Sequence, residues 1–152
     1  MSTGLLASLA AASPNCRVVK LEEEPSPPKI RRLLREADGV TVLGGLGAVM
    51  LVEELRAGAM GTMTGLGYPE VLVDIVRRWF AGDTDGAHSE FYRILPLIRF
   101  EAQPGISVAI RKEIYRRRGA TRSARVRAPG GRLDPGTLAD LEDLLLRLDL
   151  QA

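Results

Sequence analysis

The sequence predicts an α/β fold in which parallel strands alternate with helices early in the chain and only helices follow. Short apolar runs alternate with helical patterns as far as Gly65, in the order βαβαβ. This order forces parallel strands and right-handed crossovers. No further strand is predicted after Gly65, and the 152 residues are 45% hydrophobic, which is enough for one buried core. The chain is therefore expected to be one folded unit with a small parallel sheet.

The first part of the chain contains six expected elements. They are a helix over 5–12, a strand over 17–21, a helix over 27–37, a strand over 40–43, a helix over 48–57 and a strand-like run over 59–64. Ser26 is the expected N-cap of the second helix, with Pro27 at its first position, because both residue types favour those places. The second strand ends at Gly44 and Gly45, where the chain turns into the next helix.

Four helical patterns and one irregular stretch make up the rest. Helices are expected over 69–81, 85–99 and 106–118, and Asp134 and Pro135 cap a final amphipathic helix. Residues 119–133 are rich in Arg, Gly and Pro and are expected to be extended or mobile. We therefore divide the chain into residues 1–65, residues 66–118 with the C-terminal helices, and residues 119–152 with a flexible connection and the terminal helix.

Composition excludes several classes of protein. A net charge of +2 is mild, and the late arginines lack interleaved aromatic residues beyond Tyr115, so we predict solvated helix faces and no nucleic-acid partner. A single Cys16 and a single His88 argue against disulfides and against a metal site. No run reaches the ~20 apolar residues of a membrane span, and no signal peptide is recognisable. The protein is expected to be cytoplasmic, without membrane, metal or cofactor.

Lys20 is the residue expected to do covalent chemistry. It ends the first strand and precedes the acidic residues 22–24. A lysine amine is nucleophilic only when neutral, which requires a buried, apolar site that lowers its pKa. The local pattern by itself is more typical of a solvated surface charge, and residues 22–24 are more typical of a solvated connection than of an ion site.

The order of the motifs resembles the C-terminal half of the dihydrodipicolinate synthase and N-acetylneuraminate lyase family. The lysine strand VVKLE, the glycine strand end TVLGGLG and the run EELRAGAMGTMTG follow one another at the family's spacing. The matching residues are 18–22, 41–47, 53–65, 81–83, 109–113 and 117–120. The resemblance covers nearly the whole chain.

This resemblance implies that residues 1–65 are the C-terminal part of a (β/α)8 TIM barrel, about three parallel strands with their helices. Lys20 then matches the lysine that forms a Schiff base with pyruvate or a sugar-derived 2-keto acid. Gly45 or Leu46, and Met63, match positions lining the keto-acid pocket; the spacing leaves open which of Gly45 and Leu46 corresponds. The implied enzyme is a lyase of the class I aldolase or dehydratase type.

The family's threonine-rich motif and its proton-relaying tyrosine lie before the lysine, so this chain does not contain them. We expect the chain to be truncated and inactive alone. The alternative is a non-catalytic helical scaffold, a remnant of the barrel. In both cases the first strand is an open edge, which favours association, and we expect a homo-oligomer.

Overall fold

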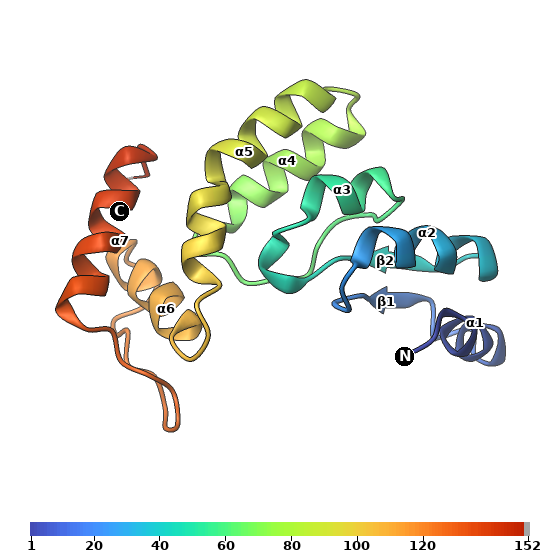
Figure 1. Ribbon diagram of the computed structural model, residues 1–152, viewed down its shortest axis with the longest axis horizontal. Coiled ribbons are helices and arrows are strands. Elements are labelled where there is room, and N and C mark those ends of the chain that lie inside the picture. Colours follow the sequence, from blue (N-terminus) through green and yellow to red (C-terminus); the bar gives the residue numbers. More distant parts are fainter. Residues whose placement is uncertain (151–152) are drawn as a thin grey trace.

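The computed structural model describes residues 1–150, and it confirms the α/β class (Figure 1). Within these residues the helices are α1 (Thr3–Ala12), α2 (Ser26–Glu36), α3 (Leu51–Arg56), α4 (Pro69–Phe80), α5 (Thr84–Glu101), α6 (Ser107–Arg117) and α7 (Pro135–Arg147). The strands are β1 (Val18–Lys20) and β2 (Thr41–Leu43), and a short 3-10 turn, η1, covers Leu46–Ala48. The last two residues of the segment 119–152 lie outside the described part.

The sheet is smaller than expected. β1 and β2 pair in parallel, with Val18 opposite Thr41 and Lys20 opposite Leu43. The run over 59–64 is not a strand, because only one parallel bridge joins Gly44 to Thr62. Two backbone hydrogen bonds flank that bridge, from Gly44 N to Gly61 O and from Met63 N to Gly44 O, both 2.9 Å long. The third strand of the prediction is therefore a short extended segment on the β2 side, and its place in a barrel stays a prediction.

Two helix starts also differ from expectation. Ser26 does not cap α2; it is the first helical residue, Pro25 occupies the N-cap, and the Ser26 hydroxyl donates to Glu54 instead. The helix expected over 48–57 begins only at Leu51. The preceding residues Leu46, Gly47 and Ala48 have positive φ angles of 43°, 68° and 68°, and an α-helix cannot include such residues.

Two apolar clusters form the core. One lies between the sheet and helices α1 and α2, and its members include Leu21, Ile30, Leu33 and Val42. The other lies among helices α3 to α7 and includes Ile75, Phe91, Ile94, Ile110 and Leu141. Helix α3 connects the two clusters, because Leu51 and Leu55 face the second cluster and Ala57, directly after the helix, belongs to the first. Figure 1 shows the sheet and α1 at one end, α6 and α7 at the other, and α5 between them.

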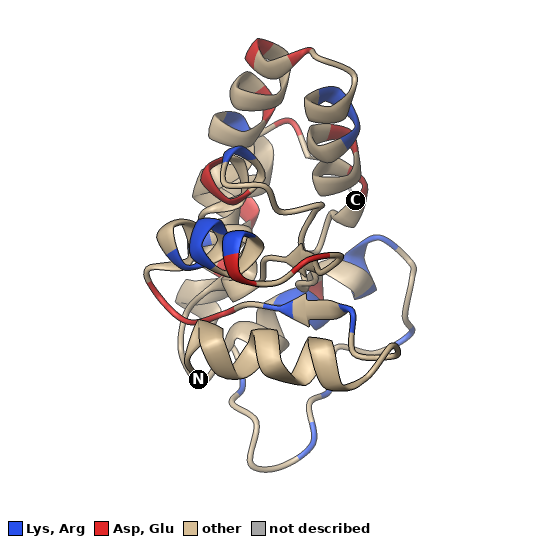
Figure 2. Ribbon diagram, turned by 90° about the vertical axis from the view of Figure 1, so that its right-hand side faces the viewer, with Lys and Arg blue, Asp and Glu red and all other residues tan. Residues whose placement is uncertain are grey.

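The C-terminal helices agree closely with the sequence prediction. Asp134 caps α7 by accepting from the backbone N–H groups of Gly136 and Thr137. Residues 121–134 contain neither helix nor strand, and Figure 2 shows Lys and Arg residues along this loop and none on α1. No helix in the described part of the chain is long and apolar enough to cross a membrane.

A buried ion pair joins the segment after residue 65 to the helical part. The Glu101 carboxylate on α5 is 1% exposed, and it accepts from Gly67 N at 2.8 Å and from Arg111 Nε at 3.0 Å. Burial raises the pKa of Glu101, although the Gly67 N–H and Arg111 act in the opposite direction. The pair therefore fixes the entry into α4 against α5 and α6.

Replacing Arg111 by Met should destabilise the protein by about 3 kcal/mol at pH 8, because it leaves a buried carboxylate without its cation. The pKa of Glu101 in the folded state then rises further above its unfolded value. The penalty should therefore shrink as the pH falls toward about 4, because the raised pKa leaves this carboxyl mostly neutral in the folded state both with and without Arg111. Urea denaturation at the two pH values measures the difference. Arg147→Met, which breaks an exposed pair with Asp143, is the control and should have no measurable effect. An equal loss for Arg111→Met at both pH values would contradict this account.

Candidate functional site

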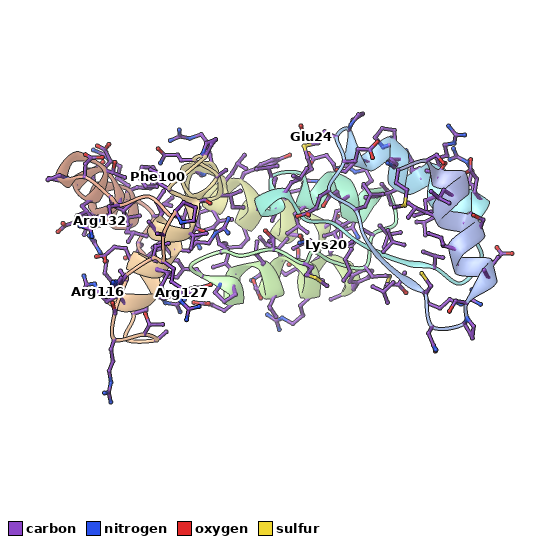
Figure 3. The ribbon with its side chains drawn as sticks, turned by 90° about the horizontal axis from the view of Figure 1, so that it is seen from below. Lys20, Glu24, Phe100, Arg116, Arg127 and Arg132 are labelled. Atoms are coloured by element: carbon purple, nitrogen blue, oxygen red, sulfur yellow. The ribbon has the colours of Figure 1, made fainter. Side chains whose placement is uncertain are left out.

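Lys20 lies at the carboxyl end of β1, near the middle of the molecule (Figure 3). Its side chain is 38% exposed, and its Nζ atom lies 3.2 Å from Glu22 Oε1. The dry, apolar surroundings expected for this lysine are therefore not provided by residues 1–150. The amine instead has a carboxylate as its immediate partner.

Glu22 contacts the ends of both strands. In the sequence it stands out only as one of the acidic residues 22–24, and its pairing with Lys20 was not predicted. Its Oε1 atom accepts from the backbone N–H of Leu46 at 3.2 Å as well as contacting Lys20. The Leu46 N–H, followed by Lys20, lowers the pKa of this carboxyl group. Residues two apart in an extended segment point to the same side, so the spacing of Lys20 and Glu22 was the available signal.

Gly45 and Leu46 take part in different ways. A Cβ atom on Gly45 would lie 2.5 Å from Glu22 Oε1, so only glycine lets this carboxylate rest against the backbone. Leu46 contributes its N–H group, and its φ of 43° is a left-handed conformation. For a residue with a side chain this conformation costs roughly 1–2 kcal/mol, and such strain concentrates at functional sites.

Met63 completes the face of the sheet that carries Lys20. Lys20 is opposite Leu43, and Gly44 is opposite Thr62. Side chains alternate along each strand, so Lys20, Glu22, Gly45 and Met63 lie on one face. Met63 is 51% exposed. The structure thus brings all four positions to the same edge of the sheet, although their roles in binding stay predictions.

A second carboxylate lies behind the same strand end. Glu54 on α3 is 1% exposed, and its Oε1 atom accepts from the Ser26 hydroxyl at 2.6 Å. A Cβ atom on Gly44 would lie 2.5 Å from Glu54 Cδ. Burial raises the pKa of Glu54, opposed by the hydrogen bond from Ser26. Gly44 and Gly45 therefore separate a buried carboxyl group from a solvated one.

The late arginines lie away from this site. Figure 3 shows Arg116, Arg127 and Arg132 at the end formed by α6 and α7, and Lys20 near the middle of the molecule. Arg116 is held by Glu113 in an ion pair of 2.7 Å. His88 is half-buried between Trp79 and Tyr92, and its Nδ1 atom lies 2.6 Å from Thr84 O. These residues offer nothing to the face that carries Lys20.

Comparison with known proteins shows that the chain is similar to part of a dehydratase and of dihydrodipicolinate synthases. No protein-family model matches it. It is 35% identical over 153 residues to L-2-keto-3-deoxyarabonate dehydratase of Azospirillum brasilense, covering 98% of this chain and 48% of that protein. The crystal structure of a dihydrodipicolinate synthase from Rhodopseudomonas palustris matches with a TM-score of 0.92 and 34% identity, covering 97% of this chain and 50% of that one.

A further match is a prophage protein of the dihydrodipicolinic acid synthase family from E. coli K12, solved in complex with pyruvate. Its TM-score is 0.85 at 26% identity, and the match covers 98% of this chain and 51% of that one. This chain thus spans about half the length of the relatives it matches. The agreement over nearly all of its residues shows that the chain is similar to about half of each of these proteins of the dihydrodipicolinate synthase family, and the C-terminal half indicated by its motifs fits these matches.

Proposed function

We propose that this chain supplies the Schiff-base lysine of a lyase that acts on pyruvate or a sugar-derived 2-keto acid. The observation that carries the proposal is the position of Lys20. It lies at the carboxyl end of a parallel strand, beside a carboxylate, on the face that also carries Gly45 and Met63. In barrel enzymes the reacting groups come from the carboxyl ends of the strands.

The proposed reaction begins with the Lys20 amine attacking the keto carbon. The resulting carbinolamine loses water and becomes an imine, whose protonated form withdraws electrons from the neighbouring bond. Proton transfers are needed at each step. Glu22 is the candidate proton carrier, because it is 3.2 Å from Lys20 Nζ and is held there by Leu46 N–H.

The substrate class rests on the relatives. One of them is named as a dehydratase of a keto-deoxy sugar acid, and another was solved with pyruvate. We propose a 2-keto acid substrate of this kind, a cytoplasmic location and chemistry that uses no cofactor. The division at residues 65 and 118 is likewise a proposal, in which the first segment carries the reactive lysine.

Incubation with pyruvate and borohydride should attach one reduced pyruvate to Lys20. The chain has three lysines, and Lys29 and Lys112 both have backbone carbonyl partners in the structure. Intact mass spectrometry should show a single adduct that Lys20→Ala abolishes and Lys112→Ala leaves unchanged. Glu22→Gln should slow labelling by on the order of 10²-fold if Glu22 carries the proton.

The alternative proposal is a non-catalytic scaffold, and the exposed sheet edge favours it. A well-folded sample that forms no adduct at Lys20, at any pyruvate concentration tested, would support the scaffold over the lyase. A detectable aldol cleavage of a keto-deoxy sugar acid by this chain would contradict the expectation that it is inactive alone.

We also propose that the chain self-associates through an apolar groove beside residues 60–64, at the sheet edge opposite the first strand. The groove, of about 610 Å³, lies between residues 60–64 and α4. Met60, Val73 and Phe80 line it and are 53%, 66% and 53% exposed. Within residues 1–150 the backbone N–H of Thr62 makes no hydrogen bond. Such an edge invites pairing with another chain, and large exposed apolar patches mark association surfaces.

Replacing Val73 by Glu should weaken this association, because a charge would be buried in the apolar contact. Size-exclusion chromatography with light scattering should show the wild-type chain as an oligomer and Val73→Glu shifted toward monomer. Val108→Glu is the matched control, since Val108 is also exposed but lies on α6. A monomeric wild-type chain, or equal effects of the two substitutions, would remove the support for this surface.

A further inference from the structure

The strand end at Gly44 and Gly45 lies between two carboxyl groups of different surroundings. On one side Glu54 fills the space that a Cβ on Gly44 would need, and on the other side Glu22 fills the space beside Gly45. Glu54 is buried, whereas Glu22 is exposed to solvent. The backbone of these two glycines is thus in direct contact with both groups.

Glu54 connects three parts of the fold at this point. Its Oε1 atom accepts from Ser26 at the start of α2, and its own backbone carbonyl accepts from Ala59 N at 2.9 Å, just before the segment that pairs with Gly44. Its side chain packs against Gly44, which bonds that segment through both its N–H and its C=O. The group therefore lies where the chain segments that follow β1 and β2 meet.

The backbone of residues 46–48 has a strained conformation that contacts with other parts of the fold must stabilise. Leu46 and Ala48 have positive φ angles of 43° and 68°. A strained conformation of this kind persists only when the surrounding structure determines it. From the solvent side this backbone is contacted by Glu22, which packs against Gly45 and accepts a 3.2 Å hydrogen bond from Leu46 N–H, but the Glu22 side chain is 47% exposed. The buried contact with Glu54 is the firmer of the two.

We propose that Glu54 is a positioning residue: from behind Gly44 it holds the backbone of residues 44–46 so that Leu46 N–H binds Glu22 and keeps Glu22 beside Lys20. The link between Glu54 and Leu46 does not depend on any reaction. Only its consequence for Lys20 rests on the proposed function, so the two ideas can fail separately.

The role requires a side chain of this shape that accepts from Ser26. The groups that influence the Glu54 carboxyl are Ser26 on α2 and Glu53 on its own helix, and no cation is among them. Burial raises the pKa of Glu54, which favours the neutral acid. A glutamine has nearly the same shape and can still accept from Ser26, so Glu54→Gln should preserve the arrangement. Glu54→Ala removes both the packing and the hydrogen bond.

The test follows the Leu46 amide by ¹H–¹⁵N NMR across a pH titration. In the wild type the chemical shift of this amide should follow the ionisation of Glu22. The midpoint should lie below the ordinary glutamate range, because the hydrogen bond from Leu46 N–H is the main cause that lowers the Glu22 pKa. In Glu54→Ala the Leu46 signal should lose this titration, and the Glu22 midpoint should move up toward the ordinary value. Glu54→Gln should behave as the wild type does.

Leu55→Ala is the matched control. Leu55 is a buried neighbour on α3 that faces the other core cluster, so its loss lowers stability without removing the contact with Gly44. It should leave the Leu46 titration unchanged. If Glu54→Ala and Leu55→Ala both lower stability and both keep the Leu46 titration, Glu54 only packs and the proposal is overturned.

Ser26→Ala provides a second, milder variant in case Glu54→Ala does not fold. It removes only the hydrogen bond to Glu54, and it should shift the Glu22 midpoint part of the way toward the ordinary value; an unshifted midpoint would count against the proposal. A wild-type chain that shows the coupled titration but forms no pyruvate adduct would contradict the proposed function and leave this inference standing.

Discussion

Parallel pairing of the strands is the constraint on which the rest of the site depends. Because β1, β2 and the segment over 60–63 run in the same direction, their carboxyl ends lie at one edge of the sheet. Lys20 ends the first strand there and Glu22 follows it, Gly45 and Leu46 follow the second strand, and Met63 ends the third segment. An antiparallel arrangement of neighbouring strands would place these groups at opposite ends.

The two glycines at this edge are explained by side chains that come from elsewhere. Gly44 is small because the buried Glu54 lies behind it, and Gly45 is small because Glu22 lies in front of it. Their environments drive the two carboxyl pKa values apart, upward for Glu54 and downward for Glu22. Such a separation is how proteins assign different tasks to similar groups. Here the solvated group contacts the lysine and the buried one contacts the backbone.

The small sheet makes the rest of the molecule depend on helix packing. Two strands of three residues give few backbone hydrogen bonds, while helix α3 links the sheet side to the cluster among α4, α5, α6 and α7. The small sheet also leaves apolar side chains uncovered, in the groove between residues 60–64 and α4. This groove lies at the edge of the sheet where no further strand pairs within residues 1–150.

The sequence by itself determined the α/β class, the order of the first two strands and their helices, the helices after residue 65, the Asp134 cap and the resemblance to a known family, because these follow from local periodicity and from motifs that are close in the chain. It also placed Lys20 at a strand end. It could not show that residues 59–64 form only one bridge, that Ser26 bonds Glu54 rather than capping α2, or that Glu22 is the partner of Lys20. Each of these depends on which residues distant in the chain become neighbours, and only the tertiary structure decides that.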